Sequence, residues 1–186
     1  AFIVAVPTPF RSDKTCDLSL VRGAVKSILA CLSPGNLIII ESTVPPYTLR
    51  DHIKPLLEDA GYTVGKDVFL AFCPERVLPG NIIAELLNNA RIIGGYTPHC
   101  AAMAAQYYRD VVKGKIILTD AATAEMTKLA ENACRDVNIA LANELTQICH
   151  DLKINVLDVI KLANEHPRVN FLSPGPGVGG HCLAVD

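Results

Sequence analysis

The sequence predicts an α/β fold in which part of a doubly wound parallel sheet is followed by a long helix. Over the first 120 residues, short apolar runs that resemble buried strands alternate with segments of helical spacing. This alternation is typical of βαβ units, whose parallel strands are covered by helices. Beyond Asp120 the pattern changes, because residues 121–152 contain neither Gly nor Pro and are rich in Ala, Leu, Glu and Asn. A helix of that length is far above the usual average, so we expect it to leave the sheet domain.

Five strands are expected, each from a short apolar run: 2–6, 37–40, 68–72, 91–94 and 116–118. The run Leu37–Ile40 is aliphatic throughout, as in a parallel strand that is buried on both faces. Pro7-Thr8-Pro9 ends the first run, and prolines are confined to the ends or edges of strands.

The expected helices lie between these strands. Asp17 is a plausible N-cap for a helix that runs to about Leu32 and is broken by Ser33-Pro34-Gly35. Thr97-Pro98 supplies a cap and a first-turn proline for a helix to about Arg109. The remaining predictions are helices at 46–60, 121–152 and 155–165, a loop with some helical character at 73–90, and a Pro- and Gly-rich loop at 167–180.

Composition excludes several classes of protein. The net charge is −2, so there is no basic surplus for nucleic acid or an anionic membrane surface, and no apolar run reaches the ~20 residues of a membrane span. The seven cysteines form no C-x-x-C pair, which argues against a disulfide framework and against a zinc site, and favours a reducing, cytoplasmic setting. Because Ala1 opens inside an apolar run and Asp186 follows the glycine-rich stretch directly, we expect the chain to be a fragment.

That glycine-rich stretch, GPGVGGHCLAVD at 175–186, carries the sharpest chemical signal. Glycines let the backbone approach a ligand closely, and they leave Cys182 exposed, where its thiolate can act as a nucleophile. The alternatives are a structural turn with a buried cysteine, or a metal pair formed by His181 and Cys182. The metal pair is the weaker of these two alternatives, since the sequence contains no second pair of ligands.

Polar residues follow three of the predicted strands. Ser42 and Thr43 come after one strand and Thr8 after another, where doubly wound folds bind ligands. The alternative is ordinary helix capping, which these residues taken alone would favour. Glu75, in CPERVLPG, is suited to act as a general base, or it simply pairs with Arg76 or water.

The long helix carries a further candidate pair. Lys128 and Asn132 lie four residues apart and share a face among largely apolar neighbours. An ammonium and an amide so placed can stabilise an oxyanion, whereas the alternative is an ordinary solvated stripe.

Taken in order, ESTVPP, PERVLPG, AEMTKLAENACRDVN and GPGVGGHCLAVD resemble the UDP-glucose/GDP-mannose dehydrogenase family over essentially the whole chain. The resemblance implies a Rossmann-like NAD-binding domain at 1–119 whose first strands are missing, and a helical central domain at 120–186 that ends in the catalytic cysteine loop. The resemblance further leads us to expect that the family's UDP-binding C-terminal domain is not included in these 186 residues. It also implies NAD as cofactor and oxidation of the C6 alcohol of a nucleotide sugar to a carboxylate, with two NAD⁺ reduced per sugar.

The resemblance assigns a role to each candidate residue. Cys182 captures the C6 aldehyde as a thiohemiacetal, which becomes a thioester after the second hydride loss, and Lys128 and Asn132 hold the oxygen at C6. Glu75 and Thr43 serve thioester hydrolysis, and Asp186 orients a water or assists the base. The implied cofactor contacts are Thr8, Ser42 and Thr43; the implied substrate contacts are Glu75, Arg76, Lys128, Asn132, Arg168, Asn170 and Gly179; no metal is expected.

Within the family, the motifs favour the N-acetylhexosamine branch. Pro79 stands where UDP-glucose enzymes carry a second Glu. The implied substrate is UDP-N-acetyl-D-mannosamine, with UDP-GlcNAc, UDP-glucose and GDP-mannose as alternatives. The resemblance also implies a homodimer or larger homo-oligomer built on the long helix, and we expect the isolated fragment to be inactive. A non-catalytic scaffold of the same fold and a hydroxyacid-type dehydrogenase that transfers a single hydride are the rival functions.

Overall fold

The first compact unit of the protein is built on a five-stranded sheet. The computed structural model describes residues 1–77 and 80–177. The strands are β1 (Phe2–Val4), β2 (Leu37–Ile40), β3 (Phe69–Phe72), β4 (Arg91–Gly95) and β5 (Ile116–Asp120), in the order β1-β2-β3-β4-β5. All neighbouring pairs are parallel except β3 and β4, which run antiparallel. The parallel-dominated α/β fold is therefore confirmed, with one reversed strand pair that the sequence pattern does not predict.

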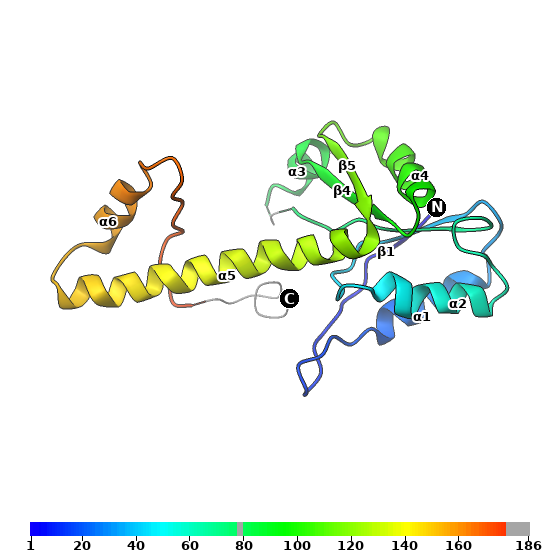
Figure 1. Ribbon diagram of the computed structural model, residues 1–186, viewed down its shortest axis with the longest axis horizontal. Helices are drawn as coiled ribbons and strands as arrows, with labels where there is room; N and C mark the ends of the chain where they lie inside the picture. The colour runs from blue at the N-terminus through cyan, green and yellow to red at the C-terminus, as the bar shows by residue number, and fades with distance from the viewer. Residues whose placement is uncertain (78–79, 178–186) are drawn as a thin grey trace. The chain divides into compact units, whose positions relative to one another are not determined.

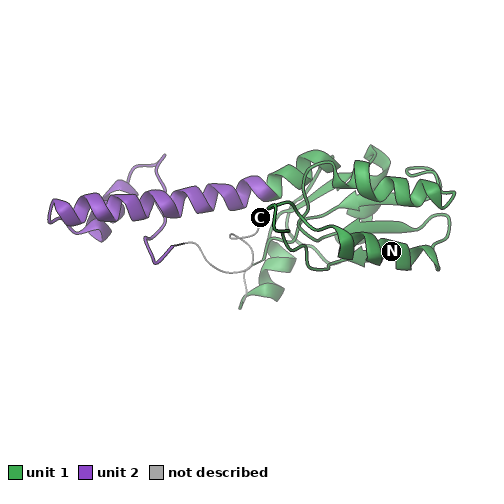
Figure 2. Cartoon of the chain, turned by 90° about the horizontal axis from the view of Figure 1, so that it is seen from below, with its two compact units in different colours: residues 1–128 green, residues 129–186 purple. Residues whose placement is uncertain are grey.

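Helices follow most of the strands (Figure 1). They are α1 (Ser19–Leu29), the π-helical turn η1 (Leu49–Ile53) that continues into α2 (Lys54–Asp59), α3 (Ile82–Asn88), α4 (Pro98–Arg109), α5 (Ala121–Asp151) and α6 (Val156–Ala163). The long helix and the helix after it are confirmed. The chain divides within α5 into two units, Ala1–Lys128 and Leu129–Asp186 (Figure 2).

The strands β2 and β3 are buried on both faces of the sheet, as the aliphatic run of β2 predicts. Ile38 and Ile40 point into a core shared with α1 and α2, whereas Leu37 and Ile39 point into a second core shared with α4. Because successive side chains of a strand alternate between faces, a strand covered on both sides has to be apolar at every position.

Several element boundaries differ from the predictions. The segment 46–60 begins its helix at Leu49 rather than Pro46, since Tyr47 has φ 68° and cannot belong to a right-handed helix. The cap of α1 is Leu18, while the Asp17 carboxylate accepts from the Ser19 N–H. The helical character expected within the loop at 73–90 is present as α3.

The second unit is held together by asparagine side chains. Asn138 on α5 donates to the carbonyl of Asn170 (2.8 Å) and accepts from the N–H of Leu172 (2.7 Å). Asn164, just after α6, makes the same two-way contact with the backbone of Phe171, at 2.7 and 3.0 Å. These amides fix the backbone of a segment that has no regular structure of its own.

Candidate functional site

The predicted polar residues emerge from the same edge of the sheet. Because β1, β2 and β3 are parallel, the segments that carry Thr8, Thr43 and Glu75 all leave their strands at the carboxyl ends. In open α/β sheets this edge is where ligands bind. The structure thus brings together the three loops that the sequence singled out.

Ser42 ties two of these loops together. Its hydroxyl accepts from the N–H of Val6 (2.8 Å) and donates to the carbonyl of Val6 (2.7 Å), and the side chain is buried. Val6 directly precedes the Pro7-Thr8-Pro9 turn, so Ser42 fixes the spacing of the segments that carry Thr8 and Thr43. Its hydroxyl is fully engaged within the chain.

Thr8 and Thr43 differ from Ser42 in this respect. Both are half-buried, and their hydroxyls make no hydrogen bond within the part of the chain that the structure describes. These hydroxyls lie at the carboxyl ends of β1 and β2, the edge of the sheet at which open α/β folds bind ligands.

Glu75 and Arg76 face different surroundings. Glu75 is exposed, and its carboxylate accepts from the N–H of Val77 (2.6 Å). The Arg76 guanidinium donates to the carbonyl of Ala90 (3.0 Å), so this side chain supports the start of β4. The carboxylate of Glu75 remains accessible to water and to a ligand.

Behind these loops lies a buried polar network that the sequence analysis missed. Arg91, at the start of β4, donates to the Glu41 carboxylate (3.2 Å) and to the Cys73 thiol (3.5 Å). The Tyr108 hydroxyl donates to the same Glu41 oxygen. Burial raises the pKa of the Cys73 thiol and that of Tyr108. Glu41 and Cys73 directly follow β2 and β3. The network therefore connects the two points at which the loops that carry Thr43 and Glu75 begin.

Lys128 and Asn132 both lie on α5, one turn apart. Lys128 is half-buried, and Asn132 is only 6% exposed. A buried amide on an otherwise solvated stripe would be unusual, because burying polar groups costs free energy unless they are bonded. The burial of Asn132 therefore speaks against the solvated-stripe alternative for this residue.

Glu125, one turn before Lys128, is a second residue that the sequence analysis missed. It is fully buried, and its carboxylate accepts from the N–H groups of Tyr47 (2.6 Å) and Leu49 (3.0 Å). Burial raises the pKa of Glu125 to about 7, although these N–H groups oppose the shift. The sequence signal that could have indicated Glu125 was a single carboxylate between Ala124 and Lys128. In the structure Ala124 is buried and Lys128 is half-buried.

This raised pKa predicts a pH dependence of stability. Glu125 holds its proton more tightly when folded, so its contribution is present below the ordinary value of 4.5 and is lost as pH rises through about 7. After allowance for solvent screening, the loss is about 2 kcal/mol. We expect urea unfolding of the full-length protein at pH 5 and pH 8 to show this loss, and Glu125→Gln to remove it. Identical pH dependence in both proteins would contradict the shift; exposed Glu58→Gln is the control.

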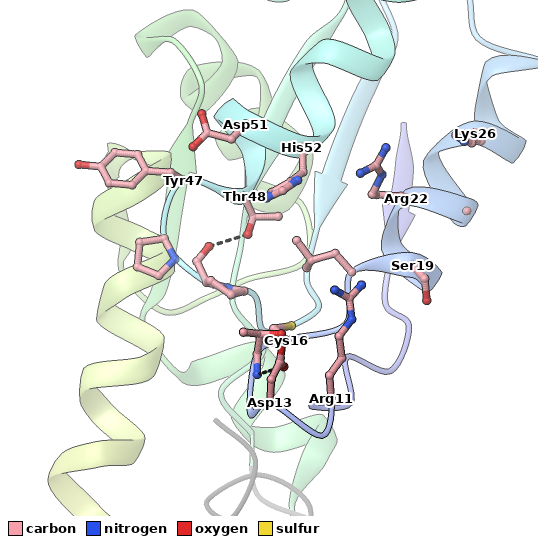
Figure 3. Close-up of a pocket in the computed structure, with 15 residues that line it drawn as sticks. Arg11, Asp13, Cys16, Ser19, Arg22, Lys26, Tyr47, Thr48, Asp51 and His52 are labelled. Atoms are coloured by element: carbon pink, nitrogen blue, oxygen red, sulfur yellow. Dashed lines mark hydrogen bonds between the residues drawn. The ribbon is translucent and has the colours of Figure 1, made fainter.

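A surface pocket lies beside the turn that Glu125 holds (Figure 3). It has a volume of about 790 Å³. Arg22 and Lys26 from α1 line one side, and Tyr47 and Asp51 line the other. Thr8, Ser42, Thr43 and Glu75 do not line it. The pocket is therefore separate from the residues that the sequence nominates.

The remaining candidates lie in the second unit or outside the described residues. Arg168 is exposed and contacts His166, and Asn170 contributes its carbonyl to Asn138. Among the described residues, no group of three or more His, Cys, Asp or Glu side chains is arranged to hold a metal, and no helix could span a membrane. Gly179, Cys182 and Asp186 lie outside the described residues, as does Pro79.

Comparison with known proteins covers the whole chain. The profile of the UDP-glucose/GDP-mannose dehydrogenase family, NAD binding domain, matches residues 1–112, and that of the same family's central domain matches residues 122–186. A UDP-N-acetyl-D-mannosamine dehydrogenase from Methanococcus maripaludis is 53% identical over all of this chain and 43% of its own length. An NDP-N-acetyl-D-galactosaminuronic acid dehydrogenase from Ralstonia solanacearum is 51% identical over all of this chain and 46% of its own.

Solved structures agree. The native structure of the UDP-N-acetyl-mannosamine dehydrogenase from Staphylococcus aureus is 60% identical, with a TM-score of 0.90, over 100% of this chain and 45% of that one. The UDP-D-ManNAc dehydrogenase from Pyrococcus horikoshii is 50% identical, with a TM-score of 0.94, over 98% of this chain and 43% of that one. The chain thus spans less than half the length of these relatives.

Proposed function

This chain belongs to the UDP-glucose/GDP-mannose dehydrogenase family, and from that premise we propose that the full protein oxidises UDP-N-acetyl-D-mannosamine to UDP-N-acetyl-D-mannosaminuronate. The observation that carries the proposal is the identity of 50–60% over essentially the whole chain to proteins named for that substrate. The galactosaminuronic acid relative, at 51% identity, makes a nucleotide-linked N-acetylgalactosamine sugar the second candidate.

The reaction proceeds through covalent capture on Cys182. The C6 alcohol loses a hydride and a proton, and the resulting aldehyde takes the thiol across its C=O bond, so that a C–S bond forms and the oxygen gains the proton. Loss of a second hydride and that proton gives a thioester. Water then adds to the thioester carbonyl, the C–S bond breaks, and the thiol and a carboxylate are released. Bound NAD⁺ accepts the hydride in each oxidation.

The described residues supply positioning and charge for these steps. Lys128 and Asn132 stabilise the oxygen at C6 whenever it carries negative charge. Thr43 holds the hydrolytic water, and Glu75 takes a proton from it. Thr8 and Thr43 are half-buried, and their hydroxyls make no hydrogen bond to the other described residues, which supports contacts to NAD at the ends of β1 and β2.

Other parts of the site follow from the same assignment. Asp186 assists proton transfer beside Cys182, and the backbone of Gly179 approaches the sugar. The remaining substrate contacts are Arg76, Arg168 and Asn170, and Ser42 is the remaining residue assigned to NAD binding. The Ser42 hydroxyl already accepts a hydrogen bond from Val6 and donates one to it. Its contribution to NAD binding is therefore to hold the segments that carry Thr8 and Thr43 at a fixed spacing.

We also propose that the protein assembles as a homodimer or larger homo-oligomer through α5 and acts in the cytoplasm. Support comes from large apolar side chains that α5 exposes, Val137, Leu141 and Ile148 among them. Their spacing of four and seven residues puts them on one stripe of the helix, and a second copy can cover such a stripe. Reduced cysteines, including a reactive one, suit the cytoplasm.

The test is a substrate panel on the full-length protein. Initial rates of NADH formation are measured with UDP-N-acetyl-D-mannosamine and with UDP-linked N-acetylgalactosamine, N-acetylglucosamine and glucose, and with GDP-mannose. We expect the mannosamine sugar to give a kcat/KM at least about 100-fold above the others, because lost contacts to a substrate's polar groups cost several kcal/mol. A higher value for another sugar would replace the substrate, and no NADH from any of them would favour a non-catalytic scaffold.

A further inference from the structure

A buried carboxylate fastens the turn after β2 to the helix that carries Lys128. Glu125 has no exposed surface, and each of its oxygens accepts one backbone N–H: Oε2 from Tyr47 at 2.6 Å and Oε1 from Leu49 at 3.0 Å. Above a pH of about 7 the carboxylate is ionised, and hydrogen bonds to an ionised carboxylate are roughly twice as strong as neutral ones. Within residues 1–77 and 80–177, the hydrogen bonds of the Glu125 carboxylate go to the backbone of this neighbouring turn, which indicates a positioning role.

The turn itself needs such a partner. It follows Pro45-Pro46, and Tyr47 adopts φ 68°, a left-handed conformation that costs a non-glycine residue about 1 kcal/mol or more. Inside the turn, the Thr48 hydroxyl donates to the Pro45 carbonyl (2.6 Å). On its upstream side the chain is fastened by the two Ser42–Val6 bonds. Thr43 therefore lies between two fixed points, Ser42 and the turn that Glu125 holds.

The helix is fixed at this place as well. A Cβ atom on Gly94 would come within 2.5 Å of the Ala124 Cβ, so the first turns of α5 pack directly on the backbone of β4. Lys128 lies three residues beyond Glu125 on the same helix, about 4.5 Å along its axis. A shift of the Glu125 contact thus moves the turn next to Thr43 relative to Lys128.

We propose that Glu125 is a positioning residue that sets the geometry between Thr43 and Lys128. The inference rests on the proposed function, from which the roles of those two residues come. Thioester hydrolysis is the step that needs both residues at once: Thr43 for the water, and Lys128 for the oxyanion that forms when the water adds and before the C–S bond breaks. Hydride transfer depends on Lys128 but requires no water, so loosening the contact slows hydrolysis more than oxidation.

The test is Glu125→Gln in the full-length protein, with rapid-mixing NADH traces and intact-mass measurement of quenched enzyme. Glutamine keeps the size but presents an N–H₂ group to one of the two N–H donors. We expect hydrolysis to slow at least about 10-fold more than the oxidation steps, so that a sugar thioester accumulates on the enzyme. Glu125→Asp, which keeps both acceptors on a shorter side chain, should recover part of the lost rate. Asp59→Asn, the corresponding acid-to-amide change at an exposed site at the end of α2, is the control.

The outcomes separate the alternatives. An equal fall in oxidation and hydrolysis, or a lowered Tm with unchanged ratios, means that Glu125 only stabilises the fold and overturns the inference. If Glu125→Gln fails to fold, Glu125→Asp decides alone: unchanged partitioning between oxidation and hydrolysis overturns the inference. Absence of any thioester or second NADH in the unmodified protein means that the proposed function has failed instead.

Discussion

Replacing Cys182 by alanine in the full-length protein is expected to reduce NADH formation from UDP-N-acetyl-D-mannosamine at least about 10³-fold. An aldehyde has to become tetrahedral before its carbon can give up a second hydride, and Cys182 is the group proposed to add to it. Without the thiol, the thiohemiacetal and thioester cannot form. Steady-state NADH production and the intact mass of enzyme quenched during turnover both report this loss.

The control for this substitution is Cys31→Ala, which removes an exposed thiol just after α1. It should leave the rate unchanged within about twofold, because surface substitutions rarely perturb a distant site. A Cys182→Ala protein that still makes NADH at the normal rate would favour the hydroxyacid-type dehydrogenase, which needs no nucleophilic cysteine.

The second large effect is expected for Lys128→Met, which keeps the length of the side chain and removes its charge. Loss of a preorganised group that faces developing negative charge typically costs about 10²–10³-fold in kcat. We expect that fall in kcat, with the KM for NAD⁺ nearly unchanged. Steady-state kinetics at saturating sugar and varied NAD⁺ separate the two constants.

Lys113→Met provides the matched control, since Lys113 is exposed after α4. It should behave like the unmodified protein. A fall in kcat of less than threefold for Lys128→Met would favour the interpretation of Lys128 as part of a solvated polar stripe. Other groups would then have to stabilise the oxyanion.

The sequence predicts much of the fold because its apolar patterns are strong. Both faces of Leu37–Ile40 are covered, and residues 121–151 form one helix, as their patterns indicate. The pattern could not predict that β4 and β5 run opposite to β1, β2 and β3, since an apolar run looks the same in a parallel and an antiparallel strand. The late start of the helix after Pro46 depends on the left-handed Tyr47, which a tertiary contact to Glu125 supports.

For the site, the sequence singled out candidate residues at the strand ends and on α5, and it missed the residues that hold those segments in place. Thr8 and Thr43 lie at the expected strand ends, and Asn132 is buried where a solvated stripe would leave it exposed. Ser42 is hydrogen-bonded to a residue 36 positions away. Glu125 bonds to residues 76 and 78 positions away, and Arg91 bonds to Glu41, 50 positions away. Periodicity within one segment carries no information on such long-range contacts, so only the folded arrangement reveals them.

The central claim is a four-electron oxidation through a cysteine thioester, and the most direct measurement is the NADH formed per UDP-N-acetyl-D-mannosamine consumed to completion by the full-length protein. Two NADH per sugar, with a carboxylate as product, is the predicted result. One NADH per sugar, with an aldehyde or ketone as product, would contradict the four-electron oxidation and the role of Cys182 together.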